Sequence, residues 1–440
     1  MIGIRVLLGA CVAMCLSLPA LAEVKIREVT SPGGVDAWLV EDHSIPFTAL
    51  EIRFRGGTSL DAAGKRGATY LMAALLEEGA GDLKAQDYAR KLEGLAAYFS
   101  YDARDDALSV SARFLTENRD EAVDMLRLTL NEPRFDQDAL DRVRAQIVSG
   151  LKSDLKDPRS IAGEVFARSA YADHPYETDG KGTIESVTSL TREDVLAAHR
   201  NVLARDRMVV AAVGDIDEAE LGQLLDRLFA ELPASGAPLP GPATVTIPGG
   251  VTVVDFATPQ STALFGHSGI DRDDPDFFAA YILNQILGGG SFESRLMTEV
   301  REKRGLTYGV YSYLVPKDNA AIYMGSVASS NDRIAEAIDV IRDEWRKMSE
   351  EGVTPKELQD AKTYLTGAYP LRFDGNAQIA SIMASMQMQG LPVDYIATRN
   401  DQVNAVTLDD VKRVAQELLR PEDLHFVVVG QPEGLETTTN

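Results

Sequence analysis

The chain has 440 residues, of which 45% are hydrophobic and 25% charged, and its formal net charge is −23 at pH 7. This composition is typical of a folded globular protein with enough chain for two or more domains. The excess of acidic residues argues against nucleic acid and anionic lipid as partners.

Residues 1–22 have the features of a secretory signal peptide. Arg5 supplies the positive charge, an apolar run extends over residues 6–18, and residues 20–22 (Ala-Leu-Ala) match an A-x-A cleavage site. A membrane anchor is disfavoured because the run is too short to span a bilayer. Both cysteines of the chain lie inside this segment. We therefore expect a periplasmic protein that begins at Glu23 and has no disulfide, catalytic thiol or thiolate metal site.

The residues that follow predict strands and helices in a mixed order, which then recurs. Apolar stripes predict helices at residues 68–78 and 275–287, and another helix should begin near Phe135. Thr191 and Thr407 are candidate N-caps of later helices. Such neighbouring strands and helices indicate an α+β fold with largely antiparallel sheets. Runs of apolar residues predict strands at 37–40, 47–54, 107–114, 251–256, 262–268 and 320–326.

The two halves of the chain are related by a duplication. Residues 191–195 and 407–411 both begin with threonine, and each leads at the same interval into a valine-rich strand that ends at Gly214 or Gly430. Earlier segments match in the same order at nearly the same offset. Between the halves, residues 233–242 are rich in proline and glycine, as in an inter-domain linker.

These boundaries divide the chain into five parts. They are a signal peptide (1–22), an N-terminal half (23–232), a linker (233–250), a C-terminal half (251–434) and a tail (435–440).

Motifs in both halves resemble the pitrilysin/insulinase family of inverted-motif zinc peptidases, and together they cover essentially the whole mature chain. The resemblance implies two homologous α+β halves, each a largely antiparallel sheet packed with helices, arranged as a clamshell. The matching segments are residues 56–61, 174–176 and 182–187 in the first half, and 287–290, 294–296 and 301–308 in the second.

The chemistry of this family requires a helix that carries H-x-x-E-H, whose two histidines bind zinc and whose glutamate acts as the general base. In this chain Tyr70, Ala73 and Ala74 occupy the histidine, glutamate and histidine positions. The downstream acidic ligand falls on Ser149 or Gly150, neither of which binds zinc usefully. We therefore expect the chain to hold no zinc and to hydrolyse no peptide by itself.

Other kinds of catalytic site find no support in the sequence. No G-x-S-x-G nucleophile elbow is present, and residues 288–290 (Gly-Gly-Gly) lack the Gly-Lys-Ser/Thr of a phosphate loop. No two histidines are three to five residues apart, so a zinc site would have to assemble from distant histidines, which the sequence leaves open. The histidines are His43, His174, His199, His267 and His425.

In heterodimeric members of the family, the subunit without zinc supplies an arginine and a tyrosine from its second half to the partner's active site. Arg301 and Tyr308 match these two residues. Both side chains can donate hydrogen bonds to a peptide carbonyl that is becoming an oxyanion. The structural alternatives are that Arg301 neutralises Glu299 or Glu302, and that Tyr308 packs among alternating aromatic residues of a strand.

Two functions are consistent with this resemblance. The first is a non-catalytic, substrate-binding subunit of a heterodimeric periplasmic zinc peptidase, which contributes to peptide hydrolysis only with a homologous zinc-bearing partner. The second is a peptide-binding or scaffold clamshell with no catalytic partner. Either function implies peptides as ligands, no nucleic acid, no membrane span and no cofactor bound by this chain.

Overall fold

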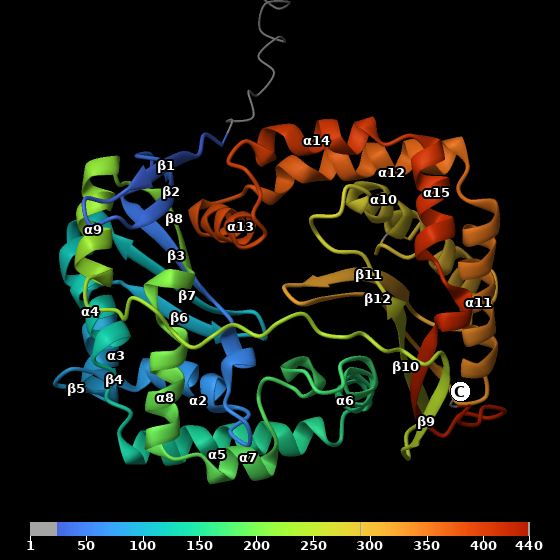
Figure 1. Cartoon of the computed structure of the whole chain (residues 1–440), viewed down its shortest axis with the longest axis horizontal. Helices are drawn as coiled ribbons and strands as arrows, with labels where there is room; N and C mark the ends of the chain where they lie inside the picture. The colour runs from blue at the N-terminus through green and yellow to red at the C-terminus, as the bar shows by residue number, and fades with distance from the viewer. Residues whose placement is uncertain (1–23, 291, 439–440) are drawn as a thin grey trace, which may run out of the picture.

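The computed structural model describes residues 24–290 and 292–438, and the predicted signal peptide at residues 1–22 lies outside this part of the chain (Figure 1). Two large β-sheets organise the fold, one formed before residue 215 and the other after residue 249. Within the described residues, no helix combines the length and the apolar character needed to cross a membrane.

The first sheet has six strands in the order β1-β2-β8-β3-β7-β6. Its neighbouring strands are antiparallel except β2 and β8, which are parallel. The central strand β8 is rich in valine and alanine and is mostly buried, as expected of a strand that is covered on both faces. The strands are β1 (Arg27–Thr30), β2 (Asp36–Glu41), β3 (Phe47–Arg55), β6 (Tyr98–Ala103), β7 (Ala107–Leu115) and β8 (Met208–Gly214).

The second sheet has five strands in the order β11-β12-β10-β13-β9, and only β9 and β13 are parallel. Strands β9, β10, β12 and β13 thus occupy the same places as β2, β3, β7 and β8 of the first sheet. The α+β class and the largely antiparallel sheets are therefore confirmed. The strands are β9 (Gly250–Asp255), β10 (Gln260–Ser268), β11 (Val310–Lys317), β12 (Ala320–Ser330) and β13 (His425–Gly430).

Helices cover the sheets and build a separate apolar core in each half. The helices of the first half are α2 (Ala68–Leu75), α3 (Ala85–Gly94), α4 (Arg119–Asn131), α5 (Gln137–Asp154), α6 (Pro158–Ala170), α7 (Ile184–Ser189), α8 (Arg192–Val202) and α9 (Glu218–Phe229). A two-stranded ribbon joins β4 (Gly79–Ala80) to β5 (Leu83–Lys84). The helices of the second half are α10 (Phe277–Leu287), α11 (Ile334–Glu351), α12 (Pro355–Ala368), α13 (Asn376–Met388), α14 (Tyr395–Ala405) and α15 (Leu408–Leu418), with a π-helical turn at Met297–Glu302.

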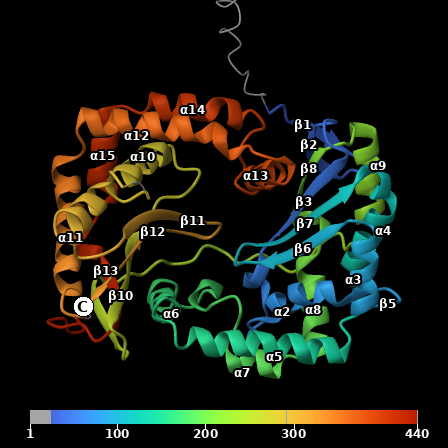
Figure 2. The same ribbon diagram turned by 180° about the vertical axis from the view of Figure 1, so that it is seen from behind.

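Each half also lends one helix to the sheet of the other half. Helix α6 packs on β10 and β13 of the second sheet, and α13 packs on β3 and β8 of the first, as both ribbon views show (Figures 1 and 2). Phe166 of α6 is 2% exposed in one of these contacts, and Met383 of α13 is fully buried in the other. Because the strands in each contact are counterparts, the exchange is reciprocal.

The two halves meet again at the tips of two equivalent hairpins. Lys317, at the end of β11, forms an ion pair with Asp105, which lies between β6 and β7. The hydroxyl of Tyr176 donates a hydrogen bond to Asp106, and the Lys317 ammonium lies 4.2 Å from the centre of the Tyr176 ring. These contacts fix the second half against the loops that surround the start of α2.

The segment between the halves is tied to both of them. The amide of Ala243 donates to Asn319 O at 2.8 Å, and the amide of Thr246 donates to Ala170 O at 3.1 Å. Beyond these bonds, Val245 and Ile247 pack with α6 and the second sheet. The predicted linker therefore follows the junction of the halves in an extended, hydrogen-bonded path.

A buried histidine in the second core makes stability depend on pH. His267 is fully buried; its Nδ1 lies 2.7 Å from Ser268 O, and its Nε2 accepts the indole N–H of Trp345 at 2.9 Å. Both ring nitrogens are thus satisfied by the neutral imidazole. Burial lowers the pKa of His267 to about 4.

We predict that His267 destabilises the fold in acid. Its pKa in the unfolded chain is about 6.5. Below that pH the imidazole is protonated in the unfolded state but stays neutral in the folded state. Between pH 6.5 and 4 this residue should remove about 1.4 kcal/mol of unfolding free energy per pH unit. Urea unfolding of the wild type and of His267→Gln measures the effect, because the stability difference between them should shrink as the pH falls.

His43→Gln is the matched control. His43 is exposed, and its hydrogen bond to Asp215, at 2.7 Å, raises its pKa. The stability that His43 contributes is fully present below its pKa in the unfolded chain and is lost as the pH rises. The difference in unfolding free energy between the wild type and His43→Gln should therefore grow as the pH falls. A difference between wild type and His267→Gln that stays constant from pH 7 to pH 5 would contradict the prediction.

Candidate functional site

The N-terminus of α2 is held by a buried carboxylate. Asp61 accepts hydrogen bonds from the amides of Gly67 and Thr69, both at 2.8 Å, and from the Thr69 hydroxyl at 2.7 Å. Its side chain is 1% exposed, and burial raises its pKa against the opposing effect of these hydrogen bonds. Gly67 precedes the helix with φ 94°, a conformation that favours glycine. The carboxylate thus fixes where the helix begins.

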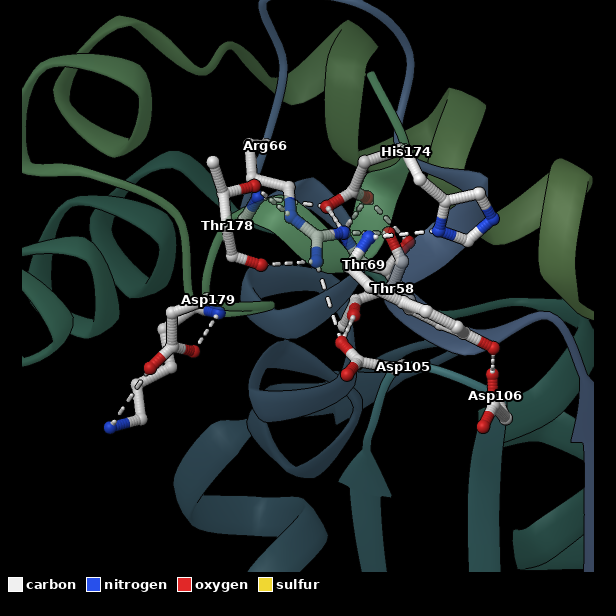
Figure 3. Close-up of polar contacts among 12 residues, drawn as sticks. Thr58, Arg66, Thr69, Asp105, Asp106, His174, Thr178 and Asp179 are labelled. Atoms are coloured by element: carbon white, nitrogen blue, oxygen red, sulfur yellow. Dashed lines mark hydrogen bonds and ion pairs between the residues drawn. The ribbon is translucent and has the colours of Figure 1, made fainter. Parts of the chain in front are cut away.

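Arg66 joins this helix start to two neighbouring loops (Figure 3). Its guanidinium donates to the Thr58 carbonyl, to the Thr178 hydroxyl at 3.0 Å and to the Thr178 carbonyl at 2.8 Å. It also lies 3.4 Å from the carboxylate of Asp105 in the β6–β7 hairpin. The motif segment at residues 56–61 and the loop that follows the segment at residues 174–176 therefore meet at the start of α2.

The three residues expected to replace the zinc motif lie on α2 and offer no metal ligand. Ala73 is 2% exposed, whereas Tyr70 and Ala74 are half-buried and pack against the first core. Ser149 and Gly150 are exposed on α5. A methyl group at the general-base position and no imidazole on this helix face mean that these residues do not fit zinc. In the described part of the chain, no three His, Cys, Asp or Glu side chains cluster as a metal site would require.

Arg301 and Tyr308 lie on the opposite half of the molecule, just before β11. Arg301 belongs to the π-helical turn, and Tyr308 is 89% exposed. The carboxylate of Glu299 is bound by Lys303 at 2.6 Å and by Arg304 at 2.8 Å. Arg301 therefore does not serve to neutralise Glu299, and Tyr308 does not pack within the sheet.

The backbone around Tyr308 is fixed even though its side chain is exposed. Leu306 is 3% exposed, and its amide donates to Val300 O at 2.9 Å. The hydroxyl of Thr307 lies 2.7 Å from Ala328 O in β12 and accepts the amide of Gly309 at 3.1 Å. A buried threonine on one side and an anchored glycine on the other thus present the Tyr308 phenol to solvent from a rigid position.

A cavity of about 750 Å³ lies between the halves, and it was not expected from the sequence. It is bounded by the end of β3, the linker, the loop after β10, the β11–β12 hairpin and the end of α13. No local motif could have revealed it, because its walls come from segments that are distant in sequence. Its charged and polar lining includes Arg55, Ser59, Asp106, Arg272, Lys317 and Asp318.

Comparison with known proteins shows which proteins this chain resembles. Residues 189–365 match the family described as the peptidase M16 inactive domain. A protein named non-peptidase homolog YmxG from Helicobacter pylori is 27% identical, with 97% of each chain covered. The crystal structure of a peptidase M16 inactive domain from Pseudomonas fluorescens has a TM-score of 0.87 and 29% identity, covering 94% of this chain and 100% of that one.

A more distant relative carries the name of a processing enzyme subunit. The mitochondrial-processing peptidase subunit beta of Saccharomyces cerevisiae is 23% identical, with 85% of this chain and 84% of the yeast protein covered. The fold is thus the two-half clamshell of the M16 inactive-domain proteins. Together with the residues found at the zinc-motif positions, these similarities are those of a pitrilysin/insulinase-like M16 peptidase that lacks the H-x-x-E-H zinc motif, in agreement with the resemblance seen in the sequence.

Proposed function

We propose that this protein is the non-catalytic, substrate-binding subunit of a heterodimeric periplasmic zinc peptidase. Arg301 and Tyr308 would act in the active site of a homologous partner that carries the zinc. The observation that carries this proposal is the exposed phenol of Tyr308, 89% accessible on a backbone anchored by the buried Thr307. A fixed, exposed aromatic hydroxyl is typical of a side chain that serves a partner or a ligand.

The two halves support a division of labour between subunits. On the first half, the positions of the zinc motif have become part of an apolar core. On the second half, Arg301 and Tyr308 carry hydrogen-bond donors. No described side chain accepts a hydrogen bond from these donors. The name of the yeast relative, a subunit of a processing peptidase, is consistent with a family in which chains work together.

The chemistry of the pair suits the stabilisation of a peptide carbonyl. A guanidinium stays charged at any relevant pH, and a phenol donates one directed hydrogen bond. Donors of this kind stabilise negative charge that develops on the carbonyl oxygen during hydrolysis. This chain would therefore orient the peptide and stabilise the oxyanion, whereas the partner would carry out the hydrolysis.

We predict that the isolated mature protein retains no stoichiometric zinc after dialysis against a weak chelator. The reason is the absence of imidazole and carboxylate groups at Tyr70, Ala73 and Ala74. Elemental analysis by mass spectrometry is the measurement, and the variant Tyr70→His/Ala73→Glu/Ala74→His is the comparison. About one tightly bound zinc per wild-type chain would contradict the proposal. The triple variant should still not hydrolyse peptide, because Ser149 and Gly150 supply no downstream carboxylate.

We predict that Tyr308→Phe and Arg301→Ala impair catalysis more than assembly. Loss of one oxyanion donor typically lowers turnover by about 10²–10³-fold. Each variant is mixed with the zinc-bearing partner, complex formation is measured by size, and peptide hydrolysis is measured per complex. The exposed residues Tyr364 and Arg90 provide matched controls, as Tyr364→Phe and Arg90→Ala, which should leave turnover unchanged.

Two other outcomes have clear meanings. If Tyr308→Phe and Arg301→Ala both form complexes that hydrolyse peptide at the parental rate, the pair has no catalytic role, and a scaffold or peptide-holding function replaces the proposal. If they lower the melting temperature or prevent association, while turnover per complex is unchanged, the pair is structural.

A further inference from the structure

Arg301 is held by an aromatic ring and not by a carboxylate. Its guanidinium carbon lies 5.1 Å from the centre of the Phe292 ring. The turn also carries Glu299 and Glu302, and the carboxylate of Glu299 is bound by Lys303 and Arg304. Within residues 24–290 and 292–438, the Arg301 side chain makes no ion pair. The ring of Phe292 is therefore the side chain that holds the Arg301 guanidinium.

Contact with a ring leaves the guanidinium free to bind something else. A carboxylate partner would accept its N–H groups edge-on and occupy the donors that a substrate carbonyl needs. An aromatic face attracts the cation through the ring quadrupole, without accepting those N–H groups in bidentate bonds. The arrangement therefore restricts the position of the charge while its hydrogen-bonding capacity is preserved.

Phe292 itself is an unusual residue to leave in solvent. Its side chain is 65% exposed, although Gly288 before it and Ser294 after it are both held in place. On one side, Gly288 O accepts the amide of Ser312 in β11 at 2.9 Å, and a Cβ at Gly288 would lie 2.5 Å from the Ser312 hydroxyl. On the other side, Ser294 is 1% exposed. The ring is thus displayed next to Arg301 and does not help to fill a core.

We propose that Phe292 is a positioning residue that pre-organises the Arg301 guanidinium for the carbonyl of an extended peptide. This inference rests on the function proposed above. A cation–π pair is weak while it is exposed to water and becomes stronger once it is desolvated. Docking of the partner over this surface would exclude water and so strengthen the hold on Arg301 at the moment when the active site is completed.

The first test needs no partner. Relaxation of the Arg301 side-chain Nε–H group by ¹⁵N NMR reports how tightly the guanidinium is held in the free chain. Phe292→Leu should lower its order parameter, and Phe292→Tyr, which keeps the ring face, should preserve it. An unchanged order parameter in Phe292→Leu would overturn the positioning role. The thermal midpoint should not change in either variant, because the side chain is 65% exposed.

The second test is a double-mutant cycle in the complex with the zinc-bearing partner. Phe292→Leu should lower kcat for peptide hydrolysis about 2- to 30-fold, which corresponds to cation–π contributions of about 0.5–2 kcal/mol. The amount of complex should stay the same, and Phe292→Tyr should restore most of the rate. In the Arg301→Ala background, Phe292→Leu should have no further effect.

The cycle separates failure of this inference from failure of the proposed function. If Arg301→Ala loses activity and Phe292→Leu does not, Phe292 has no positioning role, but the function of Arg301 stands. If Arg301→Ala keeps the parental rate, the proposed function itself fails. If Phe292→Leu lowers activity equally with and without Arg301, or reduces complex formation, the ring contacts substrate or partner directly, and the positioning role is wrong.

Discussion

Each half of this protein covers its sheet with a helix that belongs to the other half. Helix α6 buries Phe166 against β10 and β13, and α13 buries Met383 against β3 and β8. Burial of one such side chain contributes about 1.5–3 kcal/mol, so separating the halves would expose several of them at once. The clamshell is therefore one unit held by reciprocal packing, and the β11 side of the second half has a fixed place relative to α2.

The two halves differ in where they place the polar side chains discussed above. Around α2 the scaffold is intact, because Asp61 and Arg66 still fix the helix start, while the positions that would bind zinc have joined the apolar core. Before β11 the chain is anchored by the buried residues Leu306 and Thr307, while the Tyr308 side chain is displayed to solvent. Such a fold does not need the metal site for its stability when apolar side chains pack at the positions of the ligands.

Local signals predicted the elements well and the contacts between halves poorly. The expected helix at 68–78 is α2 followed by a 3₁₀ turn, and Thr191 and Thr407 both cap helices through capping boxes, because these features depend on neighbouring residues. Helices α6 and α13 gave no sign that they cross over, because amphipathicity does not name the sheet that a helix will cover. The cavity between the halves and the ring beneath Arg301 join segments that only the tertiary fold brings together.

The central claim is that this chain has no metal chemistry of its own and works through a partner. The most direct measurement is native mass spectrometry of the tagged chain purified from its own host, with the zinc content and subunit composition of each species determined together. The account predicts a complex with a homologous chain that holds about one zinc, and loss of both zinc and peptide hydrolysis when that chain dissociates. A chain recovered only as itself, with bound zinc and hydrolytic activity, would contradict the account.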